Sequence, residues 1–370
     1  TLGAGNISAN STVGLNSGGN ITLNGANVTG NGNISLLGAG NSTARIQVLN
    51  STLNSNGGDI TLDQLNHSTM SEDGTTVTSP NAMTVKVSNS TLNTTNTSAS
   101  DKGNISIHAY NPNVNLSASA YNNTVRNSGS MIEVSGNSIL TGDYVTLHTE
   151  LSGANSRALP VYLNATNITA DNDISITSNL SGATSTGMSA IELRNNNTLN
   201  ATAGNITISN LRTDTGAGNG VFLNGSSAGA ISLTAGKDII LNGSVGGNGN
   251  GVQVTNATLN SSGNLTLTGN SATTGTGVNV TDSTLNASSA AITGSSNSGT
   301  GFSLTNVTLG SSLSDLTNVT LSSAGSGAGA INILDSSVVN SSNRDTLMNM
   351  TIENLTSVDM SGTAIFNNAT

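Results

Sequence analysis

The sequence predicts an all-β fold, a single-stranded right-handed parallel β-helix of about twelve coils. The first observation is a short phrase, VQVTNATLN at Val252–Asn260, which recurs as VNVTDSTLN at Val278–Asn286 and IQVLNSTLN at Ile46–Asn54. The second is a shorter phrase that follows some ten residues later, such as GNLTL ending at Leu267. In both phrases apolar and polar residues alternate, which is the period of a β-strand and not of a helix.

Repeats of this kind fill the chain. Each can be anchored on the first apolar residue of its long phrase, and successive anchors lie 24 to 47 residues apart. Weaker copies around residues 7–23 and 350–360 bring the number of units to about twelve. We expect residues 1–370 to form one continuous segment of a longer protein, because the pattern is already running at both ends. The anchors are Ile46, Val85, Ile132, Val161, Ile191, Val221, Val252, Val278, Phe302 and Ile331.

The repeat that starts at Val252 shows how one coil would be built. Its strand signals are VQV, NATL and GNLTL, and alternation places Val252, Val254, Leu265 and Leu267 on one face and the polar residues on the other. Successive coils would lie about 4.8 Å apart. Each repeat then buries its apolar face only against its neighbours. A narrow interior favours Val, Ile and Leu, in agreement with 2% aromatic residues and no Trp.

Asparagine and glycine account for the predicted corners between strands. The chain has 57 Asn and 44 Gly, the residues that adopt left-handed backbone conformations at low cost. Asn54, Asn93, Asn260 and Asn286 each follow a Thr-Leu pair. We expect these four at a corner, where stacked side-chain amides would hydrogen-bond from coil to coil.

Two stretches, residues 63–82 and 108–130, lengthen their repeats, and insertions in a solenoid usually become loops on one side. All four Tyr residues fall between positions 110 and 162. Tyr and Arg are enriched at binding hot spots, so a partner-binding surface is predicted here, although a Tyr can instead cover the apolar underside of an insertion. The candidate partner-binding residues are Tyr110, Tyr121, Arg126, Tyr144 and Tyr162.

Composition excludes several classes of protein. Disordered chains combine low hydrophobicity with high charge, whereas this chain is 34% hydrophobic and 8% charged. Its 9 basic and 19 acidic residues give a net charge of −10, which disfavours nucleic acid and anionic membranes as partners. No Cys, no apolar run of about 18 residues and no signal peptide are present. We expect a monomer that does not insert into membranes.

The acidic residues do not form a catalytic constellation. Asp171 and Asp173 fit a turn, and Glu133 and Glu192 hold the second position of their repeats, where alternation points them outward into solvent. A carbohydrate-active β-helix enzyme is the alternative, and it requires Glu72 and Asp73 to meet the polar residues of positions 110–162 in one groove. The carboxylates weighed are Glu72, Asp73, Glu133, Glu150, Asp171, Asp173 and Glu192.

The three histidines, His67, His108 and His148, lie in different repeats and lack the spacing of a metal-binding motif. The Asp-containing calcium nonapeptide of β-rolls is missing, since GNGNG at residues 247–251 has no Asp. We therefore expect no enzymatic activity, no cofactor and no metal site.

The strongest functional signal is the Asn-x-Ser/Thr sequon, which occurs 33 times. Part of this excess follows from the repeats themselves, because GNIT and NST recur with the coil. Glycosylation requires an exposed Asn, and Asn residues at coil edges would qualify. The candidate glycosylation sites are Asn20, Asn33, Asn50, Asn89, Asn104, Asn205, Asn256, Asn264, Asn279 and Asn306.

The phrases NSTLN…GGDITL, NATLNSSGNLTLTG and NSTVGLNSGGNITLNG resemble the repeats of filamentous-haemagglutinin-like exoproteins, which are bacterial adhesins exported by two-partner secretion. The density of NIT, NLT and NVT is similar to the high-molecular-weight adhesin branch, which is glycosylated on sequon Asn residues by a cytoplasmic transferase. The family's Asn-Pro-Asn secretion motif also occurs, at residues 111–113, but inside the repeats and without its Gly-rich continuation. We interpret that match as coincidence.

The resemblance implies a secreted or bacterial cell-surface adhesin. Its partners would be an outer-membrane transporter for export and a host cell-surface protein or glycan for attachment. The shaft of a contact-dependent inhibition protein, whose repeats look alike, remains an alternative. So does a repetitive biofilm or ice-binding surface, although the Thr rows that such a surface needs are irregular here.

Overall fold

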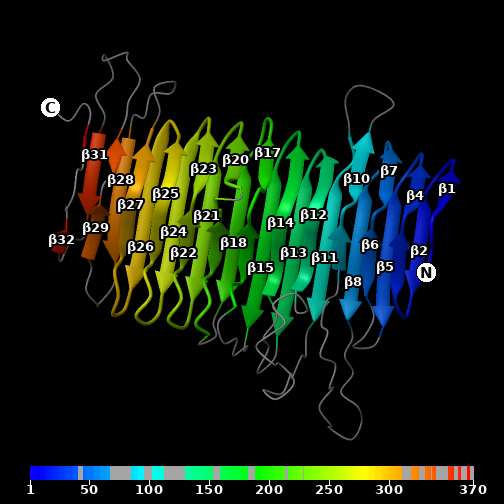
Figure 1. Cartoon of the computed structure of the whole chain (residues 1–370), viewed down its shortest axis with the longest axis horizontal. Coiled ribbons are helices and arrows are strands. Elements are labelled where there is room, and N and C mark those ends of the chain that lie inside the picture. The colour runs from blue at the N-terminus through cyan, green and yellow to red at the C-terminus, as the bar shows by residue number, and fades with distance from the viewer. Residues whose placement is uncertain are drawn as a thin grey trace, which may run out of the picture. The chain divides into compact units, whose positions relative to one another are not determined.

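The computed structural model describes residues 1–40, 45–66, 85–95, 102–111, 130–152, 159–181, 188–212, 216–227, 229–310, 318–324, 330–334, 336–338, 349–353, 357–359 and 365–366. Within these ranges every regular element is a β-strand and the strands pair in parallel, which confirms the predicted all-β class (Figure 1). The chain divides into two compact units, residues 1–185 and 186–370, which are described separately.

The described part of unit 1 contains fifteen strands. They are β1 (Gly5–Ala9), β2 (Val13–Ser17), β3 (Ile21–Asn24), β4 (Ala26–Gly30), β5 (Ile34–Gly40), β6 (Ile46–Leu49), β7 (Thr52–Asn56), β8 (Ile60–Asn66), β9 (Val85–Ser88), β10 (Thr91–Thr95), β11 (Ile105–Asn111), β12 (Ser130–Gly142), β13 (Val145–Ser152), β14 (Leu159–Ala170) and β15 (Ile174–Ser181).

Unit 2 contains the remaining described strands. They are β16 (Ile191–Arg194), β17 (Thr198–Ala201), β18 (Ile206–Arg212), β19 (Val221–Asn224), β20 (Ile231–Ala235), β21 (Ile239–Val245), β22 (Val252–Thr255), β23 (Ala257–Ser261), β24 (Asn264–Ser271), β25 (Val278–Asn286), β26 (Ser289–Ser296), β27 (Phe302–Leu309), β28 (Asn318–Ala324), β29 (Ala330–Leu334), β30 (Ser337–Val338), β31 (Asn349–Glu353), β32 (Ser357–Asp359) and β33 (Ile365–Phe366).

Each repeat contributes to three rows of strands. In unit 1 the first row runs β3-β6-β9-β12-β14, the second row runs β1-β4-β7-β10-β12-β14, and the third row runs β2-β5-β8-β11-β13-β15. The first two rows belong to one sheet, and β12 and β14 are long enough to serve both; the third row is a separate sheet. Unit 2 repeats this arrangement, with the third row β18-β21-β24-β26-β28-β31.

The register places the predicted anchors opposite one another. In unit 1 Ile46 pairs with Val85, Val85 with Ile132, and Ile132 with Val161. In unit 2 the anchors from Ile191 to Ile331 pair in the same consecutive way. The anchors therefore mark structurally equivalent positions even where the repeats differ in length.

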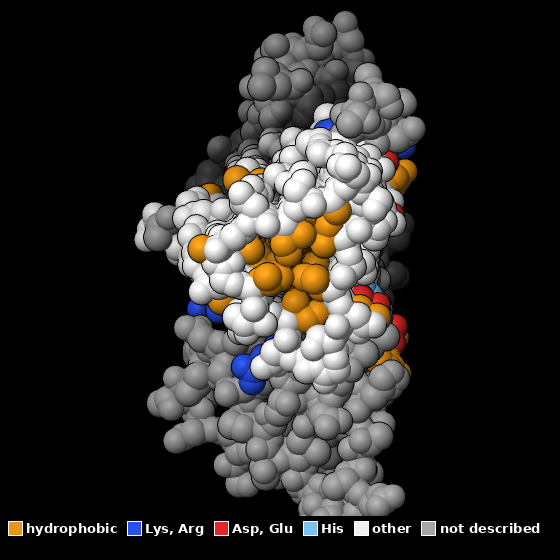
Figure 2. Space-filling view, turned by 90° about the vertical axis from the view of Figure 1, so that its right-hand side faces the viewer, with side chains coloured by type: hydrophobic (Ala, Val, Ile, Leu, Met, Phe, Trp, Pro, Cys, Tyr) orange, Lys and Arg blue, Asp and Glu red, His pale blue; other side chains and the backbone are white. Residues whose placement is uncertain are grey.

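Apolar side chains from the three rows meet in the interior. The anchors of unit 1 are completely buried, and in unit 2 Val252, Val254, Leu265 and Leu267 are buried as alternation predicts. Viewed from the β1 end, apolar side chains fill the centre and are ringed by polar side chains and backbone (Figure 2). Burial of apolar surface is the main stabilising contribution here, at about 25 cal/mol per Å².

The interior is less uniformly aliphatic than we expected. Arg212 holds an inward position at the end of β18 and is 2% exposed. Its Nη1 donates hydrogen bonds to the carbonyl oxygens of Met188 (2.8 Å) and Gly218 (3.1 Å). A buried charged group requires such partners, and the turn backbone supplies them.

The corners are formed by a different set of Asn residues from the predicted set. Asn54, Asn93 and Asn260 lie inside strands and Asn286 ends one, so their placement at a corner was wrong. The left-handed residue comes four positions earlier, as at Asn50 (φ 47°). Both Asn residues of NSTLN tolerate that conformation, so the sequence alone does not distinguish them. The left-handed Asn residues of this phrase are Asn50, Asn89, Asn256 and Asn306, with Asp282 in the equivalent place.

The corner side chains do form ladders. Asn89 Nδ2 donates to Asn50 Oδ1 (2.8 Å), and Asn50 Nδ2 donates to Asn24 Oδ1 (3.2 Å). The predicted amide stacking is also present between two strand residues, since Asn286 Nδ2 donates to Asn260 Oδ1 (2.7 Å).

A second ladder is made by the buried Ser residues that follow the corner residues Asn50 and Asn89. Ser90 Oγ accepts a hydrogen bond from Ser51 N–H (3.1 Å) and donates to the carbonyl oxygen of Ser88 (2.7 Å). Ser51 does the same one repeat earlier, accepting from Ala26 N–H and donating to Leu49. These hydroxyls pair backbone N–H groups that the corner would otherwise leave buried and unsatisfied.

The ends of the two predicted insertions are strand. β8 includes residues 63–66 and β11 includes residues 108–111, while β12 begins at Ser130. The rest of both stretches, residues 67–82 and 112–129, lies outside the described residues.

We predict that Asn89→Ala destabilises the protein by about 1 kcal/mol more than Asn89→Gly, because an L-residue with a Cβ is strained in the left-handed region and Gly is not. Both variants lose the amide bond to Asn50, so their difference isolates the backbone. Urea unfolding followed by circular dichroism measures it.

Asn93 is the matched control, since it lies within β10 and is not left-handed. There Gly should be the less stable substitution, by the usual preference for Ala over Gly in a regular element. The same order of stability at both positions would contradict the left-handed assignment of Asn89.

Candidate functional site

The predicted partner-binding residues do not form one row. Tyr110 lies on β11 in the third-row sheet, whereas Tyr162 lies on β14 in the other sheet. Tyr144, in the turn before β13, is 42% exposed. Tyr121 and Arg126 lie outside the described residues, as do Glu72, Asp73 and His67.

The third row of unit 1 instead gathers a polar column on its outer face. Parallel register places Asp63 of β8 beside His108 of β11, His108 beside His148 of β13, and His148 beside Thr177 of β15. The imidazole rings of His108 and His148 stack with centroids 5.1 Å apart. Strand spacing imposes this distance, because neighbouring strands lie about 4.8 Å apart.

Each histidine has a partner on its Nδ1 side. His108 Nδ1 lies 3.3 Å from Asp63 Oδ1, and His148 Nδ1 lies 2.6 Å from Thr177 Oγ1. Asp63 and Thr177 therefore bracket the stacked rings from the preceding and following repeats.

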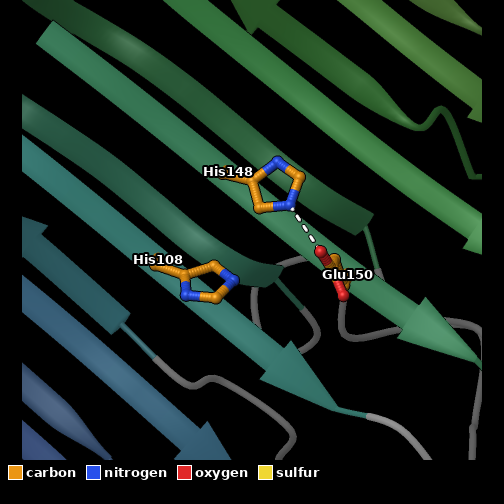
Figure 3. Close-up of side chains that lie close together, drawn as sticks. All are labelled: His108, His148 and Glu150. Atoms are coloured by element: carbon orange, nitrogen blue, oxygen red, sulfur yellow. Dashed lines mark hydrogen bonds and ion pairs between the residues drawn. The ribbon is translucent and has the colours of Figure 1, made fainter.

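Glu150 completes the cluster. It is two residues after His148 on the same strand, so both side chains point to the same face. His148 Nε2 lies 3.0 Å from Glu150 Oε1 (Figure 3). One ligand atom each from His108, His148 and Glu150 lie within 4.8 Å of one another, and all three residues are half-buried. Chemically, this is an imidazole–imidazole–carboxylate set, in which His108 Nε2 is shielded from solvent.

A sequence signal for this cluster exists in the third strands. ITLD at residues 60–63, ISIH at 105–108, VTLH at 145–148 and ISIT at 174–177 each place a polar residue at the fourth position. Aligning repeats on their first strands separates the histidines into different repeats. Aligning the third strands brings them side by side, since parallel in-register pairing places equivalent positions of successive repeats in contact.

Two acidic residues expected in solvent are buried. Glu133 is 7% exposed and Glu192 is 8% exposed, so that expectation was wrong. Alternation gives their outward direction correctly, but neighbours cover them. Glu133 lies between Lys86 and Tyr162 in the register, and Lys86 Nζ is 3.0 Å from its Oε1. Glu192 pairs with Arg194 at 2.7 Å.

The sequon Asn residues fall into two structural groups. At the left-handed corners, Asn50 and Asn89 use Nδ2, the atom that would carry a sugar, as a ladder donor. At the start of the third strand the side-chain oxygen is used instead: Asn33 Oδ1 accepts from Asp59 N–H (2.9 Å), and Asp59 Oδ1 accepts from Asn104 N–H (2.7 Å). Asn33 and Asn104 are exposed, and their Nδ2 atoms make no hydrogen bond among the described residues.

The remaining candidate sites are half-buried or exposed. Asn20 and Asn264 are exposed, and Asn205 and Asn279 are half-buried. Asn256 Nδ2 donates to the carbonyl oxygen of Ser226 (2.7 Å). At another corner, Asn306 Nδ2 donates to Asp282 Oδ1 (2.7 Å).

Comparison with protein-family models, with curated proteins and with solved structures gives no match for this chain. The part of the chain that the structure describes contains no helix long and apolar enough to cross a membrane.

We predict that Lys86→Met lowers the free energy of unfolding, because it leaves the buried Glu133 carboxylate without its cation. Loss of an exposed ion pair costs roughly 0–1 kcal/mol, and removing one partner of a buried pair costs roughly 3–5 kcal/mol. The loss for this partly buried pair should lie between these values. Adding Glu133→Gln should recover most of the loss. Urea unfolding midpoints of the single and double variants measure both effects.

Lys102→Met is the control. Its pair with Asp171 is more exposed, with 35% and 46% of the two side chains accessible, against 26% and 9% for Lys86 and Glu133. Its midpoint should barely move. Equal losses for both Lys variants would mean that burial of Glu133 has no energetic consequence.

Proposed function

We propose that this chain is a segment of a secreted bacterial surface adhesin, in which about twelve coils of a single-stranded right-handed parallel β-helix form a rod that attaches the bacterium to host cells or glycans. Attachment requires a scaffold that holds a long surface in place, and stacked coils supply one. The resemblance of the repeats to filamentous-haemagglutinin-like exoproteins supports the same class.

The observation that carries this proposal is the consecutive in-register pairing of repeats. First-row anchors pair from Ile46 to Val161 in unit 1 and from Ile191 to Ile331 in unit 2. Apolar side chains occupy the interior, so the outward-facing residues of the strands can vary without loss of the core. Such a surface suits recognition over an extended area.

Glycosylation of some sequon Asn residues is part of the proposal. Asn33 and Asn104 favour it most, because both are exposed and neither Nδ2 atom makes a hydrogen bond among the described residues. Asn33 contacts Asp59 through Oδ1, and Asn104 contacts it through its backbone N–H. Asn50 and Asn89 would have to give up or share a ladder hydrogen bond. An attached sugar would extend the adhesive surface.

The adhesive role predicts that beads coated with the purified chain bind cultured epithelial cells more than beads coated with serum albumin. Replacing Tyr110 and Tyr144 with Ala should reduce binding, because Tyr110 is half-buried, Tyr144 is 42% exposed, and a Tyr with accessible surface can anchor a partner. Thr266→Ala with Thr268→Ala, on the outer face of β24, is the control and should leave binding unchanged. No binding by the unaltered chain contradicts the adhesive role.

The same beads separate the alternatives. Binding to bacteria of the same species, and not to epithelial cells, would favour the shaft of a contact-dependent inhibition protein. Release of oligosaccharides from a polysaccharide substrate would favour a carbohydrate-active enzyme.

For protein isolated from its native host, we predict hexose-sized mass increments on peptides that contain Asn33 and Asn104, at higher occupancy than on peptides that contain Asn50 and Asn89. The physical reason is the engagement of Nδ2 at the corners. Peptide mapping by mass spectrometry measures occupancy, and the chain produced in a host without the transferase is the control. An unmodified chain from the native host contradicts the glycosylation proposal but leaves the scaffold.

A further inference from the structure

We propose that His108, His148 and Glu150 bind a divalent first-row transition-metal ion, with Zn²⁺ as the representative ion. The site is independent of the adhesive role. Imidazole nitrogen and carboxylate oxygen together are ligands that Zn²⁺ accepts, and three protein ligands leave one position for water or an incoming group. The three ligand atoms already lie within 4.8 Å of one another on adjacent strands β11 and β13 (Figure 3).

The two histidine rings are oriented with Nε2 toward the cluster. Each histidine has a neighbour at Nδ1, which leaves Nε2 to face the cluster. Metal-binding histidines commonly donate Nδ1–H or Nε2–H to a carboxylate, carbonyl or hydroxyl while the other nitrogen binds the ion. Asp63 fills that role for His108, and Thr177 fills it for His148, because a hydroxyl can accept as well as donate.

Two buried polar atoms of the cluster lack a hydrogen-bond partner. His108 Nε2 and Asp63 Oδ1 are both shielded from solvent and make no hydrogen bond among the described residues. A metal ion on Nε2 accounts for both at once. It supplies the missing partner of Nε2, and it fixes the ring proton on Nδ1, from which a small rotation gives Asp63 Oδ1 a hydrogen bond at the present 3.3 Å separation.

The distances between the ligand atoms also fit a metal ion. Metal–ligand bonds of about 2.0–2.1 Å place tetrahedral ligands about 3.3 Å apart. His148 Nε2 and Glu150 Oε1 are already at 3.0 Å. The Glu150 side chain is 44% exposed, so it can rotate to shorten its distance to His108, and all three ligand atoms already lie within 4.8 Å of one another.

Charge also favours a cation. With neutral imidazoles, the carboxylates of Asp63 and Glu150 give the cluster two negative charges. Zn²⁺ on Nε2 requires the single proton of neutral His148 to lie on Nδ1, so the proton between His148 Nε2 and Glu150 moves to Nδ1, where Thr177 Oγ1 accepts its hydrogen bond, and no net proton is released. In the competing interpretation, His108 pairs with Asp63 and His148 pairs with Glu150, and no metal ion binds.

The test uses the untagged 370-residue chain carrying His67→Ala, so that His108 and His148 are its only imidazoles. Isothermal titration with ZnCl₂ at pH 7.5 should give one equivalent bound. Titration with CoCl₂ should give a visible d–d absorption band of tetrahedral or five-coordinate Co²⁺. His108→Ala, His148→Ala and Glu150→Gln should each lower Zn²⁺ affinity at least ~100-fold, beyond the roughly 10–100-fold typical of a supporting partner.

Supporting and control variants define the site further. Thr177→Val should lower affinity within that ~10–100-fold range and shift the Co²⁺ band, because it removes the Nδ1 partner of His148 without removing a ligand. Thr146→Ala, on the same face of β13 two residues before His148, should change neither readout. Circular dichroism confirms that each variant is folded; Glu150→Gln, an exposed isosteric change, keeps the test decisive if a His variant is not.

The proposal is overturned if the His67→Ala chain binds no Zn²⁺. It is equally overturned if Zn²⁺ affinity is the same in Glu150→Gln and Thr146→Ala. Either result would leave two His–carboxylate pairs without a metal.

Discussion

Within each unit the structure depends on one constraint, the parallel in-register pairing of each repeat with the next. Pairing of this kind makes the neighbour of every residue its own equivalent one repeat away. Val85 contacts Ile46 on one side and Ile132 on the other, and all three are fully buried. A change at one interior position is therefore felt at two interfaces, which explains why most interior positions hold Val, Ile, Leu or Ala while the outward-facing positions vary. Phe302 and Arg212 are exceptions.

The same constraint assigns a structural role to the letters of the sequon. In Asn89-Ser90-Thr91 the Asn supplies the left-handed corner, and the buried Ser hydroxyl pairs the backbone N–H of Ser51 in the preceding repeat. The Thr begins the next strand. Folding alone thus selects Asn-Ser-Thr at this corner, so the number of sequons is not by itself a measure of glycosylation. What distinguishes a candidate site is whether Nδ2 is engaged, as at Asn89, or not, as at Asn104.

Sequence periodicity predicted the all-β parallel fold, the buried positions and the equivalence of the anchors, because alternation and repeat spacing are local signals. It could not choose between the two Asn residues of NSTLN, since both tolerate the corner conformation and only the path of the backbone decides. It also missed the burial of Glu133, because the covering groups, Lys86 and Tyr162, come from repeats 47 and 29 residues away in the chain. The His108–His148 contact was missed for a similar reason. The repeats differ in length, so an alignment of their first strands does not bring their third strands into register.

Outward-facing residues that the register aligns from repeat to repeat form columns on the surface, and these columns are where a functional site can form. In the third row of unit 1, the column runs Leu37, Asp63, His108, His148 and Thr177. The inward positions beside it are buried; some are aliphatic, such as Leu62 and Ile107, and others are polar, such as Gln64 and Thr149. The corresponding outer column of β24, β26 and β28 in unit 2 is Thr268, Thr293 and Ser322. Because the two columns share the same backbone geometry, their chemistry differs only through outward side chains. A scaffold of this kind can gain a metal-binding or recognition site by substituting outward residues in two or three consecutive repeats, without disturbing the core that holds them in place.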